Sequence, residues 1–444
     1  MKTNSNALFL ALMFTFLATF STQAATVPAA NQFKFVNEGD FGERSVEYFA
    51  DYRVSTFQTT PFALAFYNTT PNAYTLAIRM GNSPSESFYR WVWQANRATP
   101  VKENASLSLG KDGNLILAEA NGKVVWQTNT ANKNVVKMSL LPNGNLVLLD
   151  NKGKFVWQSF DYPTDTLLVG QSFRSTGVKR LVSRVSASDG SPGPYSYGID
   201  GRLLSMKYQV KNSKQFFYYH KSDVFSNEGS LANLTFQANP EDLGSGIHAY
   251  ELGFTFTMNG SPSSGTTIIA RPNYNVTLSF IRIDFDGNLR IYSLDPLVDW
   301  HTWDITFVQF TSNPDAINAV SECYLPKRCG ALGVCEDNQC VACPRPQGLL
   351  GWNKECLPPV LPPCKNGTNV DYYKVVGAEH YSSEFNDGTG PIKVADCQKK
   401  CDSDCKCLGF FYKAESSKCL VVPEIGTIVK VSNSSHVAYI KKSK

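Results

Sequence analysis

The chain has 444 residues, of which 18% are charged, and its formal net charge is +4. It contains no long basic run, which argues against nucleic acid and anionic membranes as partners. All twelve cysteines lie between Cys323 and Cys419, so the long preceding region must be held together by apolar burial alone.

The N-terminus has the charge and hydropathy order of a secretory signal peptide. Lys2 precedes an apolar stretch from Ala7 to Phe20, and small residues around Ala24 follow it. This stretch is shorter than the roughly 20 residues that a membrane-spanning helix needs, and the sequence contains no second apolar run of that length. We therefore predict a signal peptide over residues 1–24, cleaved from a secreted protein without a membrane span.

Sequons for N-glycosylation are consistent with secretion. Each has the pattern Asn-x-Ser/Thr, and together with a signal peptide they predict an extracellular glycoprotein. The predicted acceptors are Asn68, Asn104, Asn233, Asn259, Asn275, Asn366 and Asn433.

Three Trp-Gln pairs recur along the N-terminal third. They begin at Trp93, Trp126 and Trp157, at intervals of 33 and 31 residues. A period of roughly 20 to 50 residues is typical of a unit that buries its apolar face against copies of itself. The pattern predicts three small antiparallel sheets whose Trp rings fill a common axis, with each indole N–H paired to a group such as a neighbouring Gln.

A turn precedes the second and third Trp at a fixed distance. It reads Asp112-Gly-Asn114 in one repeat and Asn143-Gly-Asn145 in the next, and each Asn stands 12 residues before its Trp. Turns of this composition join the strands of tight hairpins. Together with short alternating or β-branched runs, they predict a β domain over residues 33–172.

Residues 173–320 are also strand-like and carry one more copy of the turn. Asp286-Gly-Asn288 is followed by Trp300, again 12 residues after the Asn. We interpret this region as a second, diverged domain of the same type. An unrelated β-sandwich with one ordinary Asp-Gly turn is the alternative.

The cysteines form two groups of six, over 321–358 and 364–444, separated by the Pro-rich segment 358–363. An even number in a secreted chain indicates disulfides, and each group allows 15 pairings. The alternative is zinc, suggested by Cys340-x2-Cys343 and Cys405-x-Cys407. The predicted disulfide cysteines are Cys323, Cys329, Cys335, Cys340, Cys343, Cys356, Cys364, Cys397, Cys401, Cys405, Cys407 and Cys419.

Two segments of the first domain resemble the bulb-type, mannose-binding lectin domain of plant S-locus glycoproteins and lectin receptor kinases. They are Val92–Arg97, with the sequence Val-Trp-Gln-Ala-Asn-Arg, and the twelve residues Trp157–Leu168. The later order is similar to the same proteins, with an EGF-like module and then a PAN/apple domain suggested by Asp396–Cys407 and Gly409–Tyr412. The closest likeness is to the secreted, epidermis-specific glycoproteins without a kinase. The resemblance implies tandem β-prism II lectin domains, followed by a disulfide-rich module and an α+β domain.

The family's monosaccharide site is Gln-x-Asp-x-Asn-x-Val-x-Tyr along one strand, where alternate side chains share one face. In the second and third repeats the Gln and Tyr are lost, so a mere hairpin turn is the favoured interpretation there. In the diverged domain Asp, Asn and Tyr are kept, but Arg290 replaces Val. The candidate sugar-binding residues are Asp112, Asn114, Asn143, Asn145, Asp286, Asn288 and Tyr292.

The sequence gives little support for a metal site or a catalytic site. Asp284, Asp286 and Asn288 have the spacing of a calcium loop, but Leu289 stands where that loop requires Gly, so we predict no metal and no cofactor. Asp161 and Asp165 could be a glycosidase pair, although they lie in a segment typical of turn and cap chemistry. We therefore predict a non-enzymatic protein that binds mannose-type glycans or high-mannose glycoproteins in the plant cell wall or apoplast, with a possible protein partner for the apple domain. A scaffold that has lost sugar binding is the alternative.

Overall fold

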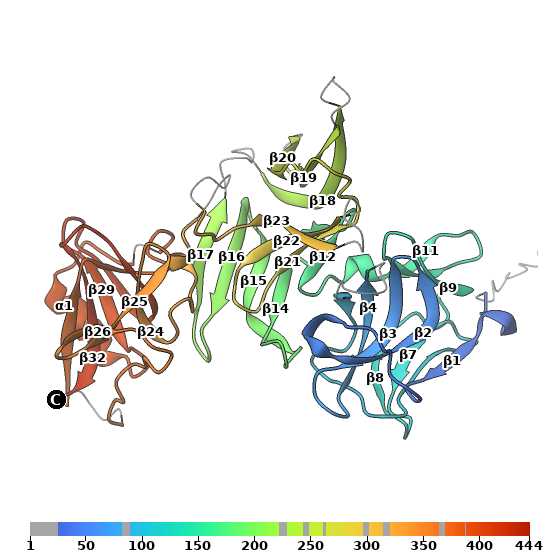
Figure 1. Cartoon of the computed structure of the whole chain (residues 1–444), viewed down its shortest axis with the longest axis horizontal. Helices are drawn as coiled ribbons and strands as arrows, with labels where there is room; N and C mark the ends of the chain where they lie inside the picture. The colour runs from blue at the N-terminus through green and yellow to red at the C-terminus, as the bar shows by residue number, and fades with distance from the viewer. Residues whose placement is uncertain are drawn as a thin grey trace, which may run out of the picture.

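The computed structural model describes residues 25–81, 89–221, 229–242, 248–260, 263–295, 302–313, 320–363, 369–386 and 388–444. The predicted signal peptide, Trp300, Cys364 and Asn366 lie outside these ranges. Within them most of the regular structure is β-strand, which confirms the predicted mainly β fold. Figure 1 shows the first domain at one end of the long axis, the second in the middle and the cysteine-rich part at the other end.

The first domain consists of three sheets, as the Trp period predicts. Its strands are β1 (Phe33–Val36), β2 (Asp51–Thr59), β3 (Phe62–Asn68), β4 (Tyr74–Met80), β5 (Arg90–Gln94), β6 (Ser106–Leu109), β7 (Leu115–Ala118), β8 (Val124–Gln127), β9 (Lys137–Leu140), β10 (Leu146–Leu149) and β11 (Phe155–Gln158). The sheet orders are β2-β3-β4-β5, β1-β6-β7-β8 and β11-β10-β9. Consecutive strands therefore form most of each sheet, while β1 pairs with β6 across the whole β2-β3-β4-β5 segment of the chain, and the three sheets surround one core.

The three Trp rings meet at the axis of this domain, which confirms the prediction for them. Trp93, Trp126 and Trp157 lie on β5, β8 and β11, and their ring centroids are 5.8–6.1 Å apart. Each pair is edge-to-face, with interplanar angles of 72–76°, an arrangement that the quadrupole of aromatic rings favours. The interval between the Trp residues therefore corresponds to equivalent positions in the three sheets, whose rings pack against one another.

The second domain repeats the three-sheet plan. Its strands are β12 (Thr166–Leu168), β13 (Ser172–Arg174), β14 (Arg180–Arg184), β15 (Pro192–Asp200), β16 (Leu203–Gln209), β17 (Gln215–Lys221), β18 (Ser230–Asp242), β19 (His248–Asn259), β20 (Ser264–Ala270), β21 (Ser279–Ile283), β22 (Leu289–Asp295) and β23 (Thr302–Val308). The orders are β14-β15-β16-β17, β13-β18-β19-β20 and β12-β21-β22-β23. Because β12 pairs with β21, a strand from within the predicted range of the first domain completes a sheet of the second.

The strand register places a different residue at the position for which the sequence suggested Trp300. In the first domain Leu117 pairs with Trp126, and Leu117 lies three residues after Asn114. The corresponding pair in the second domain is Ile291 with Phe307. Strands β22 and β23 have seven residues each, whereas β7 and β8 have four each, and the longer hairpin shifts the aromatic residue away from the 12-residue interval, so spacing alone does not find it.

The two cysteine-rich segments share one sheet. Their elements are β24 (Leu332–Glu336), β25 (Gln339–Arg345), β26 (Gly348–Gly351), β27 (Val370–Val376), β28 (Ala378–His380), α1 (Val394–Ser403), β29 (Gly409–Lys413), β30 (Lys418–Val422), β31 (Gly426–Lys430) and β32 (His436–Ser443). The orders are β26-β25-β24-β31-β28 and β27-β32-β29-β30. β24 pairs in parallel with β31, so the predicted boundary between residues 358 and 364 separates chain segments but not two independent sheets.

Disulfides link the strands of this part of the molecule, as predicted, and they lie beside apolar residues that share one core with the second domain. The described pairs are Cys323–Cys335, Cys329–Cys340, Cys343–Cys356, Cys397–Cys419 and Cys401–Cys407, and Cys405 is also disulfide-bonded. Within the described ranges no cysteine is free, which excludes a zinc site built from thiolates there. Cys397 and Cys401 are both buried on one side of α1, as their spacing of four residues predicts.

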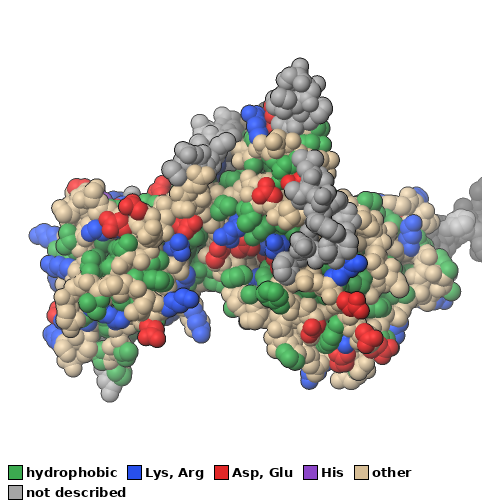
Figure 2. Space-filling model, in the orientation of Figure 1, with side chains coloured by type: hydrophobic (Ala, Val, Ile, Leu, Met, Phe, Trp, Pro, Cys, Tyr) green, Lys and Arg blue, Asp and Glu red, His purple; other side chains and the backbone are tan. Residues whose placement is uncertain are grey.

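Four short 3-10 helices complete the described structure: Ala29–Asn31, Glu47–Phe49, Ser159–Asp161 and Glu322–Tyr324. In the part of the chain that the structure describes, none of the helices has the length and apolar character that crossing a membrane requires. Charged side chains of both signs are interspersed over the face drawn in Figure 2.

Candidate functional site

The asparagines of the three turns are bound into the scaffold. The Oδ1 of Asn114 accepts a hydrogen bond from the backbone N–H of Thr130 at 3.1 Å. The Oδ1 of Asn145 accepts from the backbone N–H of Phe160 at 3.2 Å. In the second domain the Oδ1 of Asn288 accepts from the backbone N–H of Phe310 at 3.0 Å. The same side chain therefore performs the same structural task in all three hairpins.

The glutamines of the Trp-Gln pairs complete this arrangement. The Nδ2 of Asn114 donates to Oε1 of Gln127 at 2.7 Å, and Nδ2 of Asn145 donates to Oε1 of Gln158 at 2.8 Å. The sequence predicts that an indole N–H pairs with such a Gln. Instead, the Nε1 of Trp93 donates to the backbone oxygen of Tyr162 at 2.9 Å. The fixed spacing from Asn to Trp-Gln thus reflects a side-chain pair across each hairpin.

The first residue of each turn caps the turn from outside. The Oδ1 atoms of Asp112 and Asn143 each accept from the backbone N–H two residues later at 3.2 Å. Asp286 does the same for Asn288 at 2.9 Å. All three residues are exposed, so the turns present polar side chains to solvent.

The structure brings Asp286 and Tyr292 together with two residues outside the candidate sugar-binding set. The guanidinium of Arg290 donates to Asp284 Oδ2 at 2.7 Å and to Asp286 Oδ2 at 2.7 Å. The hydroxyl of Tyr292 donates to Asp284 Oδ2 at 2.9 Å. Arg290 stands where the sugar motif has Val, so its guanidinium occupies acceptors that sugar hydroxyls would otherwise use.

Electrostatics reinforce this pairing. Burial raises the pKa of Asp284, and the positive charge of Arg290 opposes that rise. Burial by itself would lower the pKa of Arg290, but hydrogen bonds to Asp286 and the charge of Asp284 hold it above its ordinary value. Burial, with Asp284 nearby, also raises the pKa of Tyr292, so this phenol remains a hydrogen-bond donor at neutral pH.

A pocket of about 400 Å³ opens where the first and second domains meet, and we call it the junction pocket. Its lining comprises Glu47, Tyr48, Phe49, Arg90, Ala187, Asp284, Phe285, Asp286, Arg290 and Tyr292. The first domain contributes an aromatic residue at its surface, since Phe49 is 89% exposed. Sequence reasoning missed Phe49, because it stands outside every repeat and motif.

The backbone that presents Phe49 has an uncommon conformation. Tyr48 has a φ of 67° and Phe49 a φ of 52°, in the left-handed region that bulky residues rarely adopt. Such strain costs on the order of 1–3 kcal/mol per residue and is found most often at functional sites. The ring of Tyr48 offsets part of this cost by packing under Arg184, whose guanidinium carbon lies 3.7 Å from the ring centroid.

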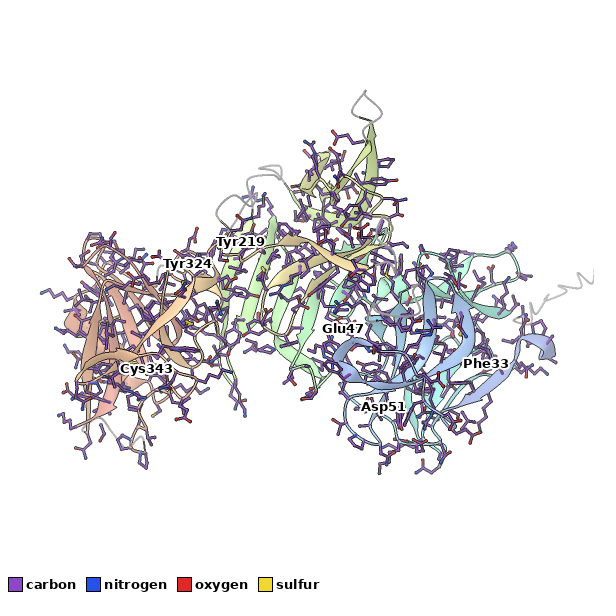
Figure 3. All side chains as sticks on the ribbon, in the orientation of Figure 1. Phe33, Glu47, Asp51, Tyr219, Tyr324 and Cys343 are labelled. Carbon is purple, nitrogen blue, oxygen red and sulfur yellow. A yellow bond between two sulfur atoms is a disulfide. The ribbon has the colours of Figure 1, made fainter. Side chains whose placement is uncertain are left out.

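A buried ion-pair network fixes the floor of the junction pocket. Glu47 Oε1 accepts from Arg282 Nη1 at 2.6 Å and from Arg90 Nη1 at 3.0 Å. Arg282 also donates to the backbone oxygen of Trp91. Although burial alone would raise it, these two arginines hold the pKa of Glu47 below its ordinary value. Figure 3 shows Glu47 at the place where the first and second domains meet.

The predicted glycosylation sites differ in exposure. Asn104, Asn259, Asn275 and Asn433 are exposed, and Asn233 is half-buried. Asn68, in contrast, is only 5% exposed at the end of β3. Their use as acceptors stays a prediction.

The two carboxylates considered as a glycosidase pair, Asp161 and Asp165, have partners in the scaffold. Asp161 accepts from Gln158 Nε2 at 3.1 Å and pairs with Arg174 at 3.0 Å, while Asp165 is buried and accepts from Thr166. Within the described ranges no group of three or more His, Cys, Asp or Glu side chains could hold a metal ion. Neither Asp161 nor Asp165 lines the junction pocket.

Comparison with known proteins shows similarity to a lectin family and to plant glycoproteins. Residues 90–188 match a family model described as D-mannose binding lectin. The chain is 47% identical to EP1-like glycoprotein 2 of Arabidopsis thaliana, covering 96% of this chain and 97% of that protein. It is 46% identical to the epidermis-specific secreted glycoprotein EP1 of Daucus carota, covering 83% of this chain and 97% of that protein. The putative receptor protein kinase ZmPK1 of Zea mays is more distant, at 28% identity over 83% of this chain and 44% of that protein. These matches confirm the predicted resemblance.

Proposed function

Because the chain belongs to the family of EP1-like glycoproteins, we propose that it is a secreted, non-enzymatic lectin-like glycoprotein of the plant cell wall or apoplast. Its ligands are mannose-type glycans or the high-mannose glycoproteins that carry them. Support for secretion comes from the N-terminal sequence and from the printed name of the carrot relative. The match of residues 90–188 to a mannose-binding lectin family supports the ligand class.

The junction pocket is the observation that carries this proposal. It is concave, and it combines an exposed aromatic ring with carboxylate, guanidinium and phenol groups. A sugar ring presents C–H groups on its face and hydroxyls around its edge, and this lining offers partners for both. Phe49 would pack against the face of the sugar ring, while Asp286, whose side chain is 43% exposed, would accept from a hydroxyl at the edge.

The strength expected from such a site is modest. Contacts between aromatic rings contribute about 0.5–1.5 kcal/mol beyond the area that they bury, and we take a similar value for the contact of Phe49 with a sugar face. Loss of about 1.4 kcal/mol corresponds to a tenfold weaker equilibrium constant. Weak single contacts of this kind suit a protein that binds many copies of a glycan on a wall or on glycoproteins.

Binding to an array of N-linked glycans tests the proposal. The intact glycoprotein is expected to bind oligomannose structures, and Phe49→Ala is expected to bind them about tenfold more weakly. Phe155→Ala is the matched control, because Phe155 is exposed on β11 and lies outside the junction pocket. Absence of oligomannose binding by the wild type, or equal binding by Phe49→Ala, would overturn the assignment.

A protein-interaction scaffold without sugar specificity is the second candidate. It is favoured by the turn asparagines, whose amides are hydrogen-bonded to the scaffold, and by Arg290, which pairs with Asp284 and Asp286 in the pocket. Under this candidate a partner protein, bound for instance by the apple domain, is captured from a wall extract equally well before and after removal of its glycans. Loss of capture after glycan removal excludes this candidate.

A further inference from the structure

A second hollow lies beside the junction pocket, on the other side of one loop of the second domain. It has a volume of about 440 Å³, and we call it the Thr75 groove. Ala187 lines the junction pocket, and the next four residues, 188–191, line the Thr75 groove. Consecutive Cα atoms are about 3.8 Å apart, so the two hollows meet at this loop. A ligand longer than one sugar residue can therefore contact both.

Hydrogen bonds from both domains hold this loop in one conformation. From the second domain, the buried Arg184 donates through Nη2 to the backbone oxygen of Ala187 at 3.1 Å. From the first domain, the hydroxyl of Thr69 donates to the backbone oxygen of Ser188 at 2.7 Å. A loop that is fixed before a ligand arrives loses little conformational freedom on binding, which favours affinity. The wall shared by the two hollows is therefore pre-formed.

The hydroxyl of Thr75, on β4, is a polar group of the groove that the scaffold does not use. Thr75 is only 6% exposed and lines the groove. Among the described residues its hydroxyl has no hydrogen-bond partner, whereas the hydroxyl of Tyr67, opposite Thr75 on β3, accepts from Arg184 at 3.3 Å. Nearly all buried polar groups have a partner in the protein, in water or in a ligand. The partner of this hydroxyl therefore comes from the groove.

The charges of the groove are balanced, which favours a neutral ligand. Its charged lining residues are one cation, Arg97, and one anion, Asp189. Each guanidinium nitrogen of Arg97 already donates to a backbone oxygen, at 2.7–3.0 Å. The Oδ1 of Asp189 accepts from the N–H and the hydroxyl of Ser191, and the exposed carboxylate keeps Oδ2 as a further acceptor. Ala98 and Pro100 add exposed apolar surface, so the groove suits a molecule with both hydroxyls and C–H faces.

We propose that the Thr75 groove is a second sugar subsite, so that the protein binds an oligosaccharide lying across the loop 187–191 and not a single sugar. This rests on the proposed function as a glycan-binding protein. One sugar residue packs on Phe49 in the junction pocket, and another forms hydrogen bonds with the Thr75 hydroxyl and the Asp189 carboxylate. Two weak contacts on one ligand add their binding strength, because the second contact forms within the same complex. Glycan length then determines affinity.

Isothermal titration of the intact glycoprotein with α-linked mannotetraose and with methyl α-mannoside tests this proposal. The tetrasaccharide is expected to bind at least tenfold more tightly than the single sugar. Thr75→Val removes the hydroxyl and nearly keeps the shape of the side chain, so affinity for the tetrasaccharide is expected to fall about fivefold while affinity for methyl α-mannoside stays unchanged. Thr56→Val is the matched control, because Thr56 is exposed on β2 and lies outside both hollows.

A second variant keeps the result decisive if Thr75→Val fails to fold. Asp189→Asn changes an exposed side chain, and a several-fold loss of affinity for the tetrasaccharide is expected. Equal affinity for the two sugars, or wild-type affinity for the tetrasaccharide in a variant that folds, overturns the proposal. Oligomannose binding that still depends on Phe49 would then leave the proposed function intact, whereas a wild-type protein that binds neither sugar would refute both.

The protein's own glycan is the competing occupant of the groove. Asn68, a predicted glycan acceptor, also lines it. Mass spectrometry of the peptide that contains Asn68 shows whether a glycan is attached there, and the titration is repeated after enzymatic removal of glycans. Equal affinity for the tetrasaccharide before and after removal is expected. Binding that appears only after removal would mean that the groove holds the glycan of Asn68, and it would overturn the proposal.

Discussion

Replacement of Asn145 by Ala separates a scaffold role from a sugar-binding role. The side chain is 2% exposed and makes three hydrogen bonds. Its Nδ2 donates to Gln158 Oε1 at 2.8 Å, and its Oδ1 accepts from Ser159 Oγ and from the Phe160 N–H at 3.2 Å each. Alanine removes all three bonds and leaves the Phe160 N–H without its acceptor.

The cost can be worked from these contacts. A buried N–H left without an acceptor costs about 1–3 kcal/mol, and each of the other two bonds contributes about 0.5–1.5 kcal/mol net. Because the three bonds share one side chain, their costs are not additive, and we expect a total loss of about 3 kcal/mol in the free energy of unfolding. Asn143→Ala is the control: this residue is exposed, its side chain caps the same turn, and its loss is expected to cost under about 1 kcal/mol.

Urea unfolding of the intact, disulfide-bonded glycoprotein measures this difference. Trp157 lies on β11 beside Gln158, so tryptophan fluorescence follows the unfolding of the first domain. The midpoint for Asn145→Ala is expected to fall well below those of the wild type and Asn143→Ala. Equal midpoints for all three would refute the reasoning, because the Asn145 side chain would then contribute nothing to the fold and would be free to serve a ligand.

Glu47→Gln leaves the buried Arg282 without its full countercharge, and we expect the free energy of unfolding to fall by about 3–5 kcal/mol, measured as a lower Tm. An unchanged Tm would contradict the ion-pair argument. Arg290→Val restores the residue of the sugar motif and frees Asp286, so at least tenfold tighter oligomannose binding is expected on the glycan array; unchanged binding would show that Arg290 does not obstruct the site. Burial lowers the pKa of His380 to about 3, so below pH 6.5 the unfolded chain binds a proton that the folded chain does not. Stability should therefore fall as pH drops from 6.5 towards 3, by roughly 2–3 kcal/mol between pH 7 and 4.5 from this group. Urea titrations at pH 7 and pH 4.5 should show a smaller decrease in the free energy of unfolding for His380→Phe than for the wild type. An equal decrease in both proteins would exclude His380 as the cause.

The periodicity of the sequence was sufficient to predict the fold of the first domain. The Trp-Gln interval, the turns and the alternating runs are local features, and apart from β1, which pairs with β6, each sheet is built from consecutive strands, so local features are enough to predict the three-sheet core. The same interval does not identify the matching aromatic residue of the second domain, because the longer strands β22 and β23 place Phe307, and not Trp300, opposite Ile291. A fixed interval is kept only where the hairpins have strands of the same length.

The candidate sites depend on contacts between residues that the spacing of motifs along the sequence does not reveal. The sequence identified the turn asparagines, but their partners are backbone groups 15 to 22 residues away, brought close by the hairpins. Arg290 was recognised as a departure from the sugar motif, yet its ion pairs with Asp284 and Asp286 depend on how β22 places it against the turn.

The sequence by itself determined the class of the protein: a mainly β, repeat-built chain with disulfides at its C-terminal end and a resemblance to plant lectins. These properties follow from composition, spacing and local turn chemistry, which are written along the chain. Only the tertiary structure decided which polar groups are already bonded and which remain available. It placed Phe49 and Asp286, which belong to two domains, in the lining of one pocket. Hydrogen bonding and burial are properties of groups that meet in space, and residues far apart in sequence decide them.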